Sequence, residues 1–186
     1  MIQSKNPILG FSAHSGTGKT TLIEKLIPKL AEINIRIALI KHSHHQFDID
    51  KPGKDSYRLR KAGAVQTLVA SKNRWALMVE TPNASNEPNL SDLISRIDCN
   101  NIELIVVEGF KHEAITKIAL HRKGHSQDLN FLSDPDIIAI ATDDDSLDLS
   151  LISDSLDPNY SKHKLDINNI DDIRDFIKHY IISSKG

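Results

Sequence analysis

The sequence predicts an α/β fold in which a largely parallel sheet carries helices on both faces. Leu104–Val107 and Ile137–Ala141 are continuous apolar runs, which are typical of strands buried on both sides. A third apolar run, residues 8–11, leads into a glycine-bearing turn, and residues 21–27 then show helical apolar spacing. Strands that alternate with helices along a chain indicate a three-layer arrangement, because each helix must bury its apolar stripe on the sheet.

The remaining elements are predicted in chain order. We expect further strands at residues 35–40, 65–70, 75–80, 115–120 and 165–167. Further helices are expected at residues 56–62, 90–97 and 170–182. Only the turn-like residues 71–74 separate two of these strands, so they are predicted to form an antiparallel hairpin and to make the sheet not purely parallel. The length, with no internal repeat and no long linker, favours a single domain over residues 1–186.

Composition excludes several classes of function. The formal net charge is -2 and the isoelectric point about 6.5, so we expect no nucleic-acid partner. Cys99 is the only cysteine, which excludes an intrachain disulfide, suits a reducing compartment and fits a small apolar position at a helix end. We find no signal-peptide pattern and no apolar segment near the roughly 20 residues of a membrane span. The sequence therefore predicts a cytoplasmic protein with no membrane partner.

The segment Ala13-His-Ser-Gly-Thr-Gly-Lys-Thr20 lies between the first strand and the first helix, where a phosphate-binding loop is expected. Small residues let successive backbone N–H groups converge on phosphate oxygens, and the helix adds its positive N-terminal end. Lys19 is expected to reach the β- and γ-phosphates, and the Thr20 hydroxyl to bind Mg²⁺. The residues expected to contact the nucleotide are His14, Ser15, Gly16, Thr17, Gly18, Lys19, Thr20 and Thr21.

This loop makes the predicted fold P-loop NTPase-type, with one departure from the usual motif. Ala13 stands where the motif has glycine, and alanine there costs about 1 kcal/mol if the position needs a positive φ. The alternative is a chance Gly-Lys-Thr sequence at a helix start.

Polar residues follow the other apolar runs, and ligands in such folds lie outside the carboxyl ends of the strands. Glu108 follows the run 104–107, so we expect it to bind Mg²⁺ through water or to orient an attacking water. Gly109 is expected to let a γ-phosphate approach the backbone. Asp143 follows another buried run and is a candidate acceptor for guanine, although the usual Asn-Lys-x-Asp motif is absent from the sequence. The alternatives are ordinary solvated carboxylates at strand ends.

The polar loop 41–55 offers further candidates. Among Asp48, Asp50 and Asp55, Asp48 is preferred as a catalytic carboxylate that completes a Mg²⁺ shell or activates water, against ordinary loop polarity. A zinc site built from His14, His42, His44 and His45 is the weaker alternative to plain loop histidines, because no cysteine lies nearby. A basic cluster either binds an anionic, phosphate-bearing ligand or forms a solvated helix face: Lys51, Lys54, Arg58, Arg60 and Lys61.

Several stretches together resemble one family, the molybdopterin-guanine dinucleotide biosynthesis protein B (MobB) group of P-loop GTPases. The resemblance spans most of residues 8–145. It rests on the segments 13–21, 39–45, 50–56, 60–64, 74–78 and 107–112. Carried over by position, Lys19, Thr20 and Thr21 match the phosphate and magnesium residues, and Glu108-Gly109 matches the second acidic motif.

The resemblance implies a homodimeric, cytoplasmic GTP-binding protein with slow, Mg²⁺-dependent GTPase activity. Such proteins assist the molybdenum cofactor guanylyltransferase as adaptors, with molybdopterin or its guanine dinucleotide as a further candidate ligand. The residues leave other functions open: a small-molecule kinase, a module that binds nucleotide or pterin without turnover, and a metal-delivery GTPase. No arginine finger is assigned, although Arg58 or Arg74 could act in trans across a dimer.

Overall fold

The computed structural model describes residues 2, 4–43, 47–82, 87–125, 128–147 and 163–184. The chain forms two compact units: the first unit, Met1–His42 with Asn89–Gly186, and the second unit, Ser43–Pro88. The second unit is therefore an insertion in the sequence of the first. The single domain predicted over residues 1–186 stays a prediction, and each unit is described by itself.

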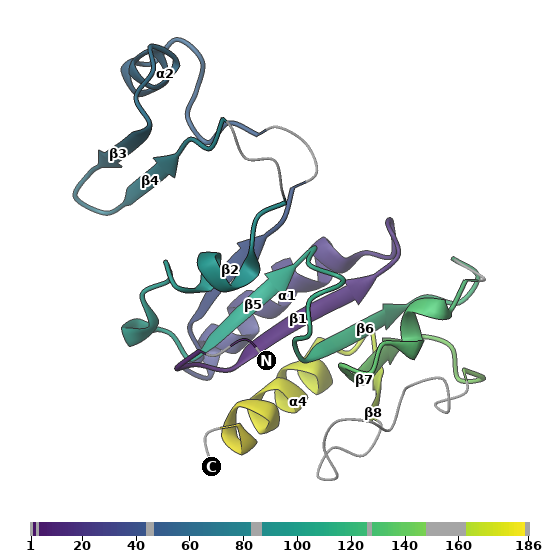
Figure 1. The fold of residues 1–186 in the computed structure, drawn as a ribbon. Coiled ribbons are helices and arrows are strands. Elements are labelled where there is room, and N and C mark those ends of the chain that lie inside the picture. The colour runs from purple at the N-terminus through teal and green to yellow at the C-terminus, as the bar shows by residue number, and fades with distance from the viewer. Residues whose placement is uncertain are drawn as a thin grey trace. The chain divides into compact units, whose positions relative to one another are not determined.

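The first unit is built on a parallel sheet (Figure 1). Its strands are β1 (Ile8–Ala13), β2 (Ile37–Lys41), β5 (Leu104–Glu108), β6 (Lys117–His121), β7 (Ile137–Thr142) and β8 (His163–Asp166). Within the described residues they form a sheet of six strands in the order β2-β5-β1-β6-β7-β8, and every neighbouring pair is parallel. The predicted parallel α/β fold is confirmed. The order also places β5 between β2 and β1, although β1 and β2 follow each other among the strands of the chain.

Helices cover both faces of this sheet. The helical elements of the first unit are α1 (Lys19–Glu32), α3 (Leu90–Ile94), α4 (Ile170–Ser183) and the short 3₁₀ segments η1 (Cys99–Asn101) and η2 (Asn130–Ser133). On one face, Leu9 and Phe11 of β1 share a core with the apolar stripes of α1 and α4. On the other face, Ile8 of β1 packs with α3. Alternate strand residues point to opposite faces, so a strand needs a continuous apolar run to serve both cores.

Local sequence sets the helix ends. Helix α3 is capped by Asn89, whose side chain accepts from the Asp92 N–H at 3.1 Å, and α4 is capped by Asn169, which accepts from the Asp172 N–H at 3.4 Å. Helix α1 ends at Glu32, and Asn34 follows with a φ of 60°. No helix in the part of the chain that the structure describes is long and apolar enough to cross a membrane.

The second unit contains α2 (Asp55–Lys61) and the hairpin of β3 (Gln66–Ala70) with β4 (Trp75–Val79). The strands pair antiparallel, with Leu68 opposite Leu77, so the predicted hairpin is confirmed. The expectation that it makes the main sheet not purely parallel is wrong, because the hairpin forms a separate sheet. Asp55 is the first residue of α2, whereas Lys54 holds the cap position.

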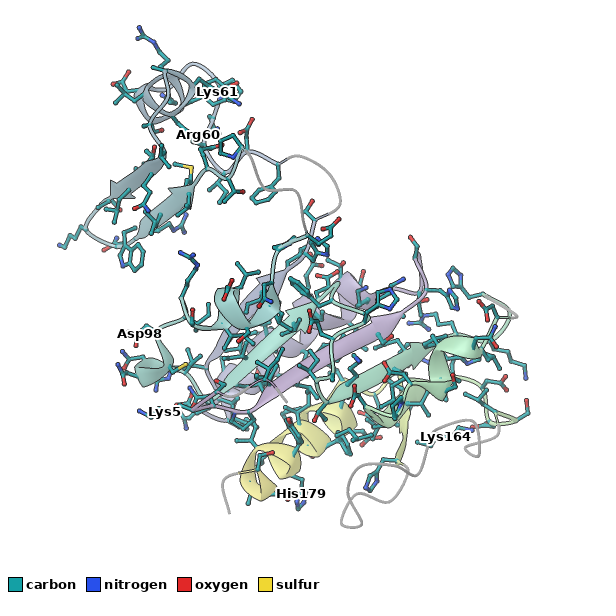
Figure 2. All side chains as sticks on the ribbon, viewed as in Figure 1. Lys5, Arg60, Lys61, Asp98, Lys164 and His179 are labelled. Atoms are coloured by element: carbon teal, nitrogen blue, oxygen red, sulfur yellow. The ribbon has the colours of Figure 1, made fainter. Side chains whose placement is uncertain are left out.

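Arg60 is the buried centre of the second unit, with 8% of its surface exposed. It lies on α2 (Figure 2), and its guanidinium donates to Asp48 at 2.5 Å, to Asp50 at 2.7 Å and to Glu80 at 2.8 Å. The hydrogen bond from Arg60 lowers the pKa of Asp50, and the same carboxylates raise the pKa of Arg60. The hairpin meanwhile exposes large apolar side chains, including Leu68 at 61% and Trp75 at 68%.

Candidate functional site

The carboxyl ends of the strands of the first unit meet at one edge of the sheet, as parallel pairing requires. In the register, Glu108 at the end of β5 lies beside Phe11 of β1 on one side and Lys41 of β2 on the other. β1 continues directly into the loop 14–18 and then into α1. The predicted acid and the predicted phosphate loop are therefore neighbours at this edge.

The loop 14–18, hereafter the phosphate loop, has the backbone of an anion cradle. Gly16 and Gly18 have φ values of 84° and 94°, which a residue with a side chain rarely adopts. Gly18 is also the residue that precedes α1, and it has no side chain to accept from the first-turn N–H groups of the helix. Ala13 is the last residue of β1 and is buried. The condition for strain at Ala13 is not met, because the strand extends to this position and φ is not positive there.

Charged and hydroxyl groups gather where α1 begins. The Thr20 hydroxyl donates to Glu108 Oε1 at 3.3 Å, and Lys19 Nζ lies 4.0 Å from the same oxygen. Lys41 Nζ approaches the other oxygen, Oε2, at 3.4 Å. Glu108 is only 8% exposed. The predicted trio of Lys19, Thr20 and Glu108 is thus brought together.

The electrostatics of this cluster favour an added anion. Burial lowers the pKa of Lys19, Glu108 opposes that shift, and the nearby cations Lys111 and Lys41 lower it further. The ammonium of Lys19 is therefore disfavoured in the folded protein without a ligand. A negatively charged group placed beside these lysines would relieve the repulsion.

The residues present fit a magnesium ion of the kind that P-loop proteins use. Such ions take few protein ligands and keep water and phosphate oxygens in the rest of the shell. A hydroxyl and a buried carboxylate only 3.3 Å apart, Thr20 and Glu108, match that donor set. Among the described residues no group of three or more histidines, cysteines or carboxylates is placed to hold a metal by itself.

Gly109, directly after Glu108, has a φ of 100°. A Cβ added there would lie 2.9 Å from the Cβ of His42 and 3.1 Å from the His42 carbonyl oxygen. The His42 N–H in turn donates to the Glu108 carbonyl at 2.8 Å, and the His42 ring stacks on Phe110. Glycine is required here by close packing against His42, and the approach of a phosphate to this residue stays a prediction.

The segment after β6 contacts the phosphate loop, which the sequence reasoning missed. Arg122 Nε donates to the Thr17 carbonyl at 3.2 Å, and His125 Nε2 bonds to the Ser15 carbonyl at 2.9 Å. A side chain of the loop also contacts this segment, since His14 Nε2 bonds to the Asp128 carbonyl at 2.7 Å. Arg122 directly follows a buried strand, so the rule that selected Glu108 and Asp143 also applies to it. No motif marks it in the sequence.

Asp143 follows β7 at the same edge and is held by the segment after β6. Its Oδ1 accepts from the Lys123 N–H at 2.8 Å, and its Oδ2 accepts from Arg122 Nη1 at 3.1 Å. The Lys123 N–H and then Arg122 lower the pKa of Asp143 below its ordinary value. The carboxylate is therefore ionised at neutral pH and fixed in orientation, as an acceptor for a ligand must be.

The other sequence candidates fall elsewhere or have other contacts. Asp48 belongs to the second unit and pairs there with Arg60, so its role at a catalytic centre or a metal stays a prediction. Arg60 is buried in the second unit, whereas the other residues of the predicted basic cluster are exposed. For the zinc alternative, His44 and His45 lie outside the described residues, and the His14 ring packs edge-on against Phe131.

Comparison with known proteins places this chain in a family. The model of "Molybdopterin guanine dinucleotide synthesis protein B" (MobB) matches residues 8–143. A "Molybdopterin-guanine dinucleotide biosynthesis adapter protein" of Escherichia coli (strain K12) is 49% identical over 183 residues, covering 97% of this chain and 96% of the relative. A protein of the same name from Haemophilus influenzae is 42% identical over 176 residues, covering 94% of this chain and 89% of the relative.

Solved structures agree in fold. A crystal structure of molybdopterin-guanine biosynthesis protein B superposes with a TM-score of 0.67 at 21% identity, over 93% of this chain and 99% of that one. A Bacillus subtilis MobB structure gives a TM-score of 0.65 at 20% identity, over 93% and 96% of the two chains. The extent of the family match and the identity to the two relatives allow one conclusion. The chain belongs to the molybdopterin guanine dinucleotide synthesis protein B (MobB) family.

Proposed function

We propose that this protein is a Mg²⁺-dependent GTP-binding adaptor with slow GTPase activity in the synthesis of molybdopterin guanine dinucleotide. The observation that carries the nucleotide site is the Thr20 hydroxyl 3.3 Å from the buried Glu108 carboxylate, at the helix start that follows Gly16 and Gly18. That combination supports a bound triphosphate with its metal. The adaptor role rests on the names of the close relatives.

The charges at the sheet edge support a triphosphate as the ligand. Lys19 has a lowered pKa because it is buried and faces Lys111 and Lys41. Phosphate oxygens on the phosphate loop would bring negative charge to this group of lysines, and the first-turn N–H groups of α1 would add their partial positive charge. Part of the binding free energy then comes from repulsion that is already present in the protein without a ligand.

The proposed hydrolysis is an in-line attack of water on the γ-phosphorus. A bond forms from the water oxygen to phosphorus, the bond to the β,γ-bridging oxygen breaks, and GDP leaves with that electron pair while the water proton passes to phosphate or a nearby base. Glu108 would hold the attacking water or a metal-bound water, and Lys19 would bind the β- and γ-oxygens. Bound Mg²⁺ supplies charge neutralisation. Turnover is slow where such sites lack an arginine finger.

Guanine selection and the partners complete the proposal. Asp143, ionised and oriented by Lys123 and Arg122, supports a contact to guanine N1–H and its 2-amino group. The partner enzyme would be the molybdenum cofactor guanylyltransferase, and molybdopterin or its dinucleotide a further ligand, in the cytoplasm. A homodimer is supported by the hairpin of the second unit, where exposed Leu68, Trp75 and Leu77 offer an apolar surface of the kind that protein partners cover.

Calorimetry of GTP and ATP binding with Mg²⁺ tests the nucleotide site. Lys19→Ala removes a charge-assisted contact and should weaken GTP binding by at least roughly tenfold. Lys25→Ala removes the same charge from an exposed position of the same helix and should leave binding nearly unchanged. Wild-type protein that binds neither nucleotide would overturn the proposal, and equal binding of both would remove guanine selection from it.

Phosphate release distinguishes hydrolysis from the other chemistries. We expect slow release of phosphate from GTP that Glu108→Gln reduces without abolishing GTP binding. Release that depends on an added acceptor alcohol would indicate a kinase instead. Tight GTP binding with no phosphate release, even with the guanylyltransferase present, would reduce the proposal to a binding module.

A further inference from the structure

The carbonyl groups of the phosphate loop are held from outside the loop. His125 Nε2 donates to the Ser15 carbonyl at 2.9 Å, and Arg122 Nε donates to the Thr17 carbonyl at 3.2 Å. Both donors come from the segment after β6, more than a hundred residues away in the sequence. A loop with two glycines that are separated by one residue has many alternative conformations, so such restraints matter there.

The geometry of a trans peptide gives these contacts a consequence. In a trans peptide the carbonyl and the following N–H point in opposite directions, and the described backbone contains no cis peptide. With the Ser15 and Thr17 carbonyls turned toward His125 and Arg122, the N–H groups of Gly16 and Gly18 face the other way. We propose that Arg122 and His125 are positioning residues that keep these N–H groups directed at the phosphates of the nucleotide. This inference rests on the proposed nucleotide site.

His125 also packs against the loop. A Cβ built on Gly16 would lie 3.0 Å from Cε1 and 3.2 Å from Nε2 of the His125 ring. The ring therefore occupies the space that a side chain at position 16 would need. Together with the φ of 84°, this contact explains why glycine is present at this position.

Arg122 has a second set of contacts that His125 does not make within the described residues. Its Nη1 donates to Asp143 Oδ2 at 3.1 Å and to Asn168 Oδ1 at 3.2 Å, while Nε remains on Thr17. One planar guanidinium thus joins the phosphate loop to the carboxylate proposed to read the base. A lysine carries a single ammonium on a flexible chain and cannot reproduce this fork. Arg122 should therefore influence both phosphate binding and base choice, whereas His125 should influence phosphate binding alone.

The phosphate loop and the segment after β6 make one further contact, in which a side chain of the loop bonds to a carbonyl group of the segment. His14 of the phosphate loop bonds to the Asp128 carbonyl at 2.7 Å, and its ring packs edge-on against Phe131 at a centroid distance of 4.8 Å. This contact holds the segment after β6 over the loop without help from Arg122 or His125. Loss of either donor should accordingly loosen the carbonyl that it holds rather than release the whole segment.

The test is calorimetry with GTP, ATP and inorganic pyrophosphate, each with Mg²⁺, on wild type and five variants. These are Arg122→Ala, Arg122→Lys, His125→Ala, His125→Gln and the matched control Lys123→Ala. Lys123 carries the same charge in the same segment. Its contact with Asp143 is made by the backbone N–H, which alanine keeps, and its side chain pairs with Asp144 instead, so removal of the side chain should change affinity by no more than about twofold. Thermal melting of each variant checks that it is folded.

We expect His125→Ala to weaken GTP, ATP and pyrophosphate binding by a similar factor of roughly three to ten, and His125→Gln to restore most of that loss. Arg122→Ala should weaken GTP by roughly tenfold or more, weaken pyrophosphate less, and lower the preference for GTP over ATP. Arg122→Lys should not restore that preference. For Arg122, a purely structural role would change melting but not the ratio between GTP and ATP affinity. For His125, a purely structural role would change melting but leave the affinities for all three ligands unchanged.

The outcomes separate this inference from the proposed function. If the alanine variants of Arg122 and His125 bind GTP as wild type does while Lys19→Ala does not, the positioning role is overturned and the nucleotide site stands. If wild type binds neither GTP nor pyrophosphate, the proposed function fails and the inference fails with it. If Arg122→Ala does not fold, the pair His125→Ala and His125→Gln and the base preference of Arg122→Lys still decide the question.

Discussion

The two units use their polar and apolar residues in opposite ways. In the first unit every residue of β1, β5, β6 and β7 is buried, and the polar side chains gather at one edge of the sheet around Glu108 and the phosphate loop. In the second unit the buried centre is a charged one, Arg60 with its carboxylates. Most of its large apolar side chains, such as Leu68 and Trp75, are on the surface.

This difference follows from size and bears on function. A large parallel sheet can bury a continuous apolar core and leave its polar strand ends free for a ligand. A short insertion of one helix and one hairpin buries too little apolar surface to be held that way. The hydrogen bonds from Arg60 to several carboxylates hold this insertion together instead. The apolar side chains that remain exposed form the kind of surface that another protein covers. This contrast is consistent with the proposed nucleotide site in the first unit and the proposed protein contact of the second unit.

The largest expected effect comes from removing the charged centre of the second unit. Arg60→Ala leaves the Asp48, Asp50 and Glu80 carboxylates together without their cation. We expect the amides of α2, β3 and β4 to exchange hydrogen at least roughly tenfold faster, while those of β1 and β5 keep their protection. Arg58→Ala, an exposed change on the same helix, is the control. Unchanged exchange in Arg60→Ala would mean that apolar packing alone holds this unit.

A change at the strand-end edge should come next in size. Gly109→Ala combines a positive φ with a Cβ only 2.9 Å from that of His42, so we expect unfolding free energy in urea to fall by about 3 kcal/mol. Gly124→Ala is matched in φ, at 74°, but a Cβ there meets nothing within 4 Å in the described part of the chain. It should lose only about 1 kcal/mol. Equal losses would show that the contact with His42 is unimportant.

These two regions also differ in how far the sequence predicts them. β5 and β7 are continuous apolar runs up to their last residue, so the sequence predicts them to within one residue of their ends. The sequence does not predict which strands are neighbours in the sheet. That β2 pairs with β5, and that the hairpin forms its own sheet, depend on long-range contacts that no local pattern encodes. Arg60 was grouped with its exposed neighbours because a single sequence does not distinguish an inward from an outward arginine on a short helix.

At the site, motif residues were predictable and supporting residues were not. Lys19, Thr20 and Glu108 lie together because each is fixed relative to a strand end, and strand ends meet. Arg122 and His125 bond to backbone carbonyls. Every residue has a backbone carbonyl, so the sequence does not indicate which ones these two side chains contact. Whether Ala13 is strained depends on its φ, which the motif alone does not give; β1 extends to this residue and its φ is not positive.

A smaller effect is expected at Lys19, which should favour nucleotide binding but lower the stability of the protein without nucleotide. Its lowered pKa means that the ammonium is less favourable in the folded protein than in the unfolded chain. That penalty is present at neutral pH and disappears as the pH rises above 10.5, the ordinary value, where both states have lost the proton. Lys19→Met should therefore raise the melting temperature without nucleotide at pH 7, and the gain should vanish above pH 10.5. GTP should stabilise the wild type more than the variant, and a variant that melts earlier at pH 7 would contradict this reasoning.

The smallest effect is expected at Asp143, which lies at the same edge of the sheet as Lys19 but is exposed to solvent. The Lys123 N–H and Arg122 lower the pKa of this carboxyl in the folded protein below the ordinary 3.8. Its stabilisation is therefore complete above pH 3.8 and is lost as the pH falls through the lowered folded value. Asp143→Asn keeps an oxygen for the Lys123 N–H and loses only the charge, so the loss at pH 7 should stay below about 1 kcal/mol, as for other solvent-screened pairs.

Thermal melting between pH 2 and pH 7, a range chosen to bracket the ordinary value of 3.8, would show the melting curves of Asp143→Asn and wild type converging toward the acid end. Asp145→Asn makes the same change of charge on the same turn and serves as the control. A gap that persists at the lowest pH would mean that the Asp143 charge is not what stabilises the edge. The geometry of the Arg122 fork on Thr17 and Asn168 would then carry that role by itself.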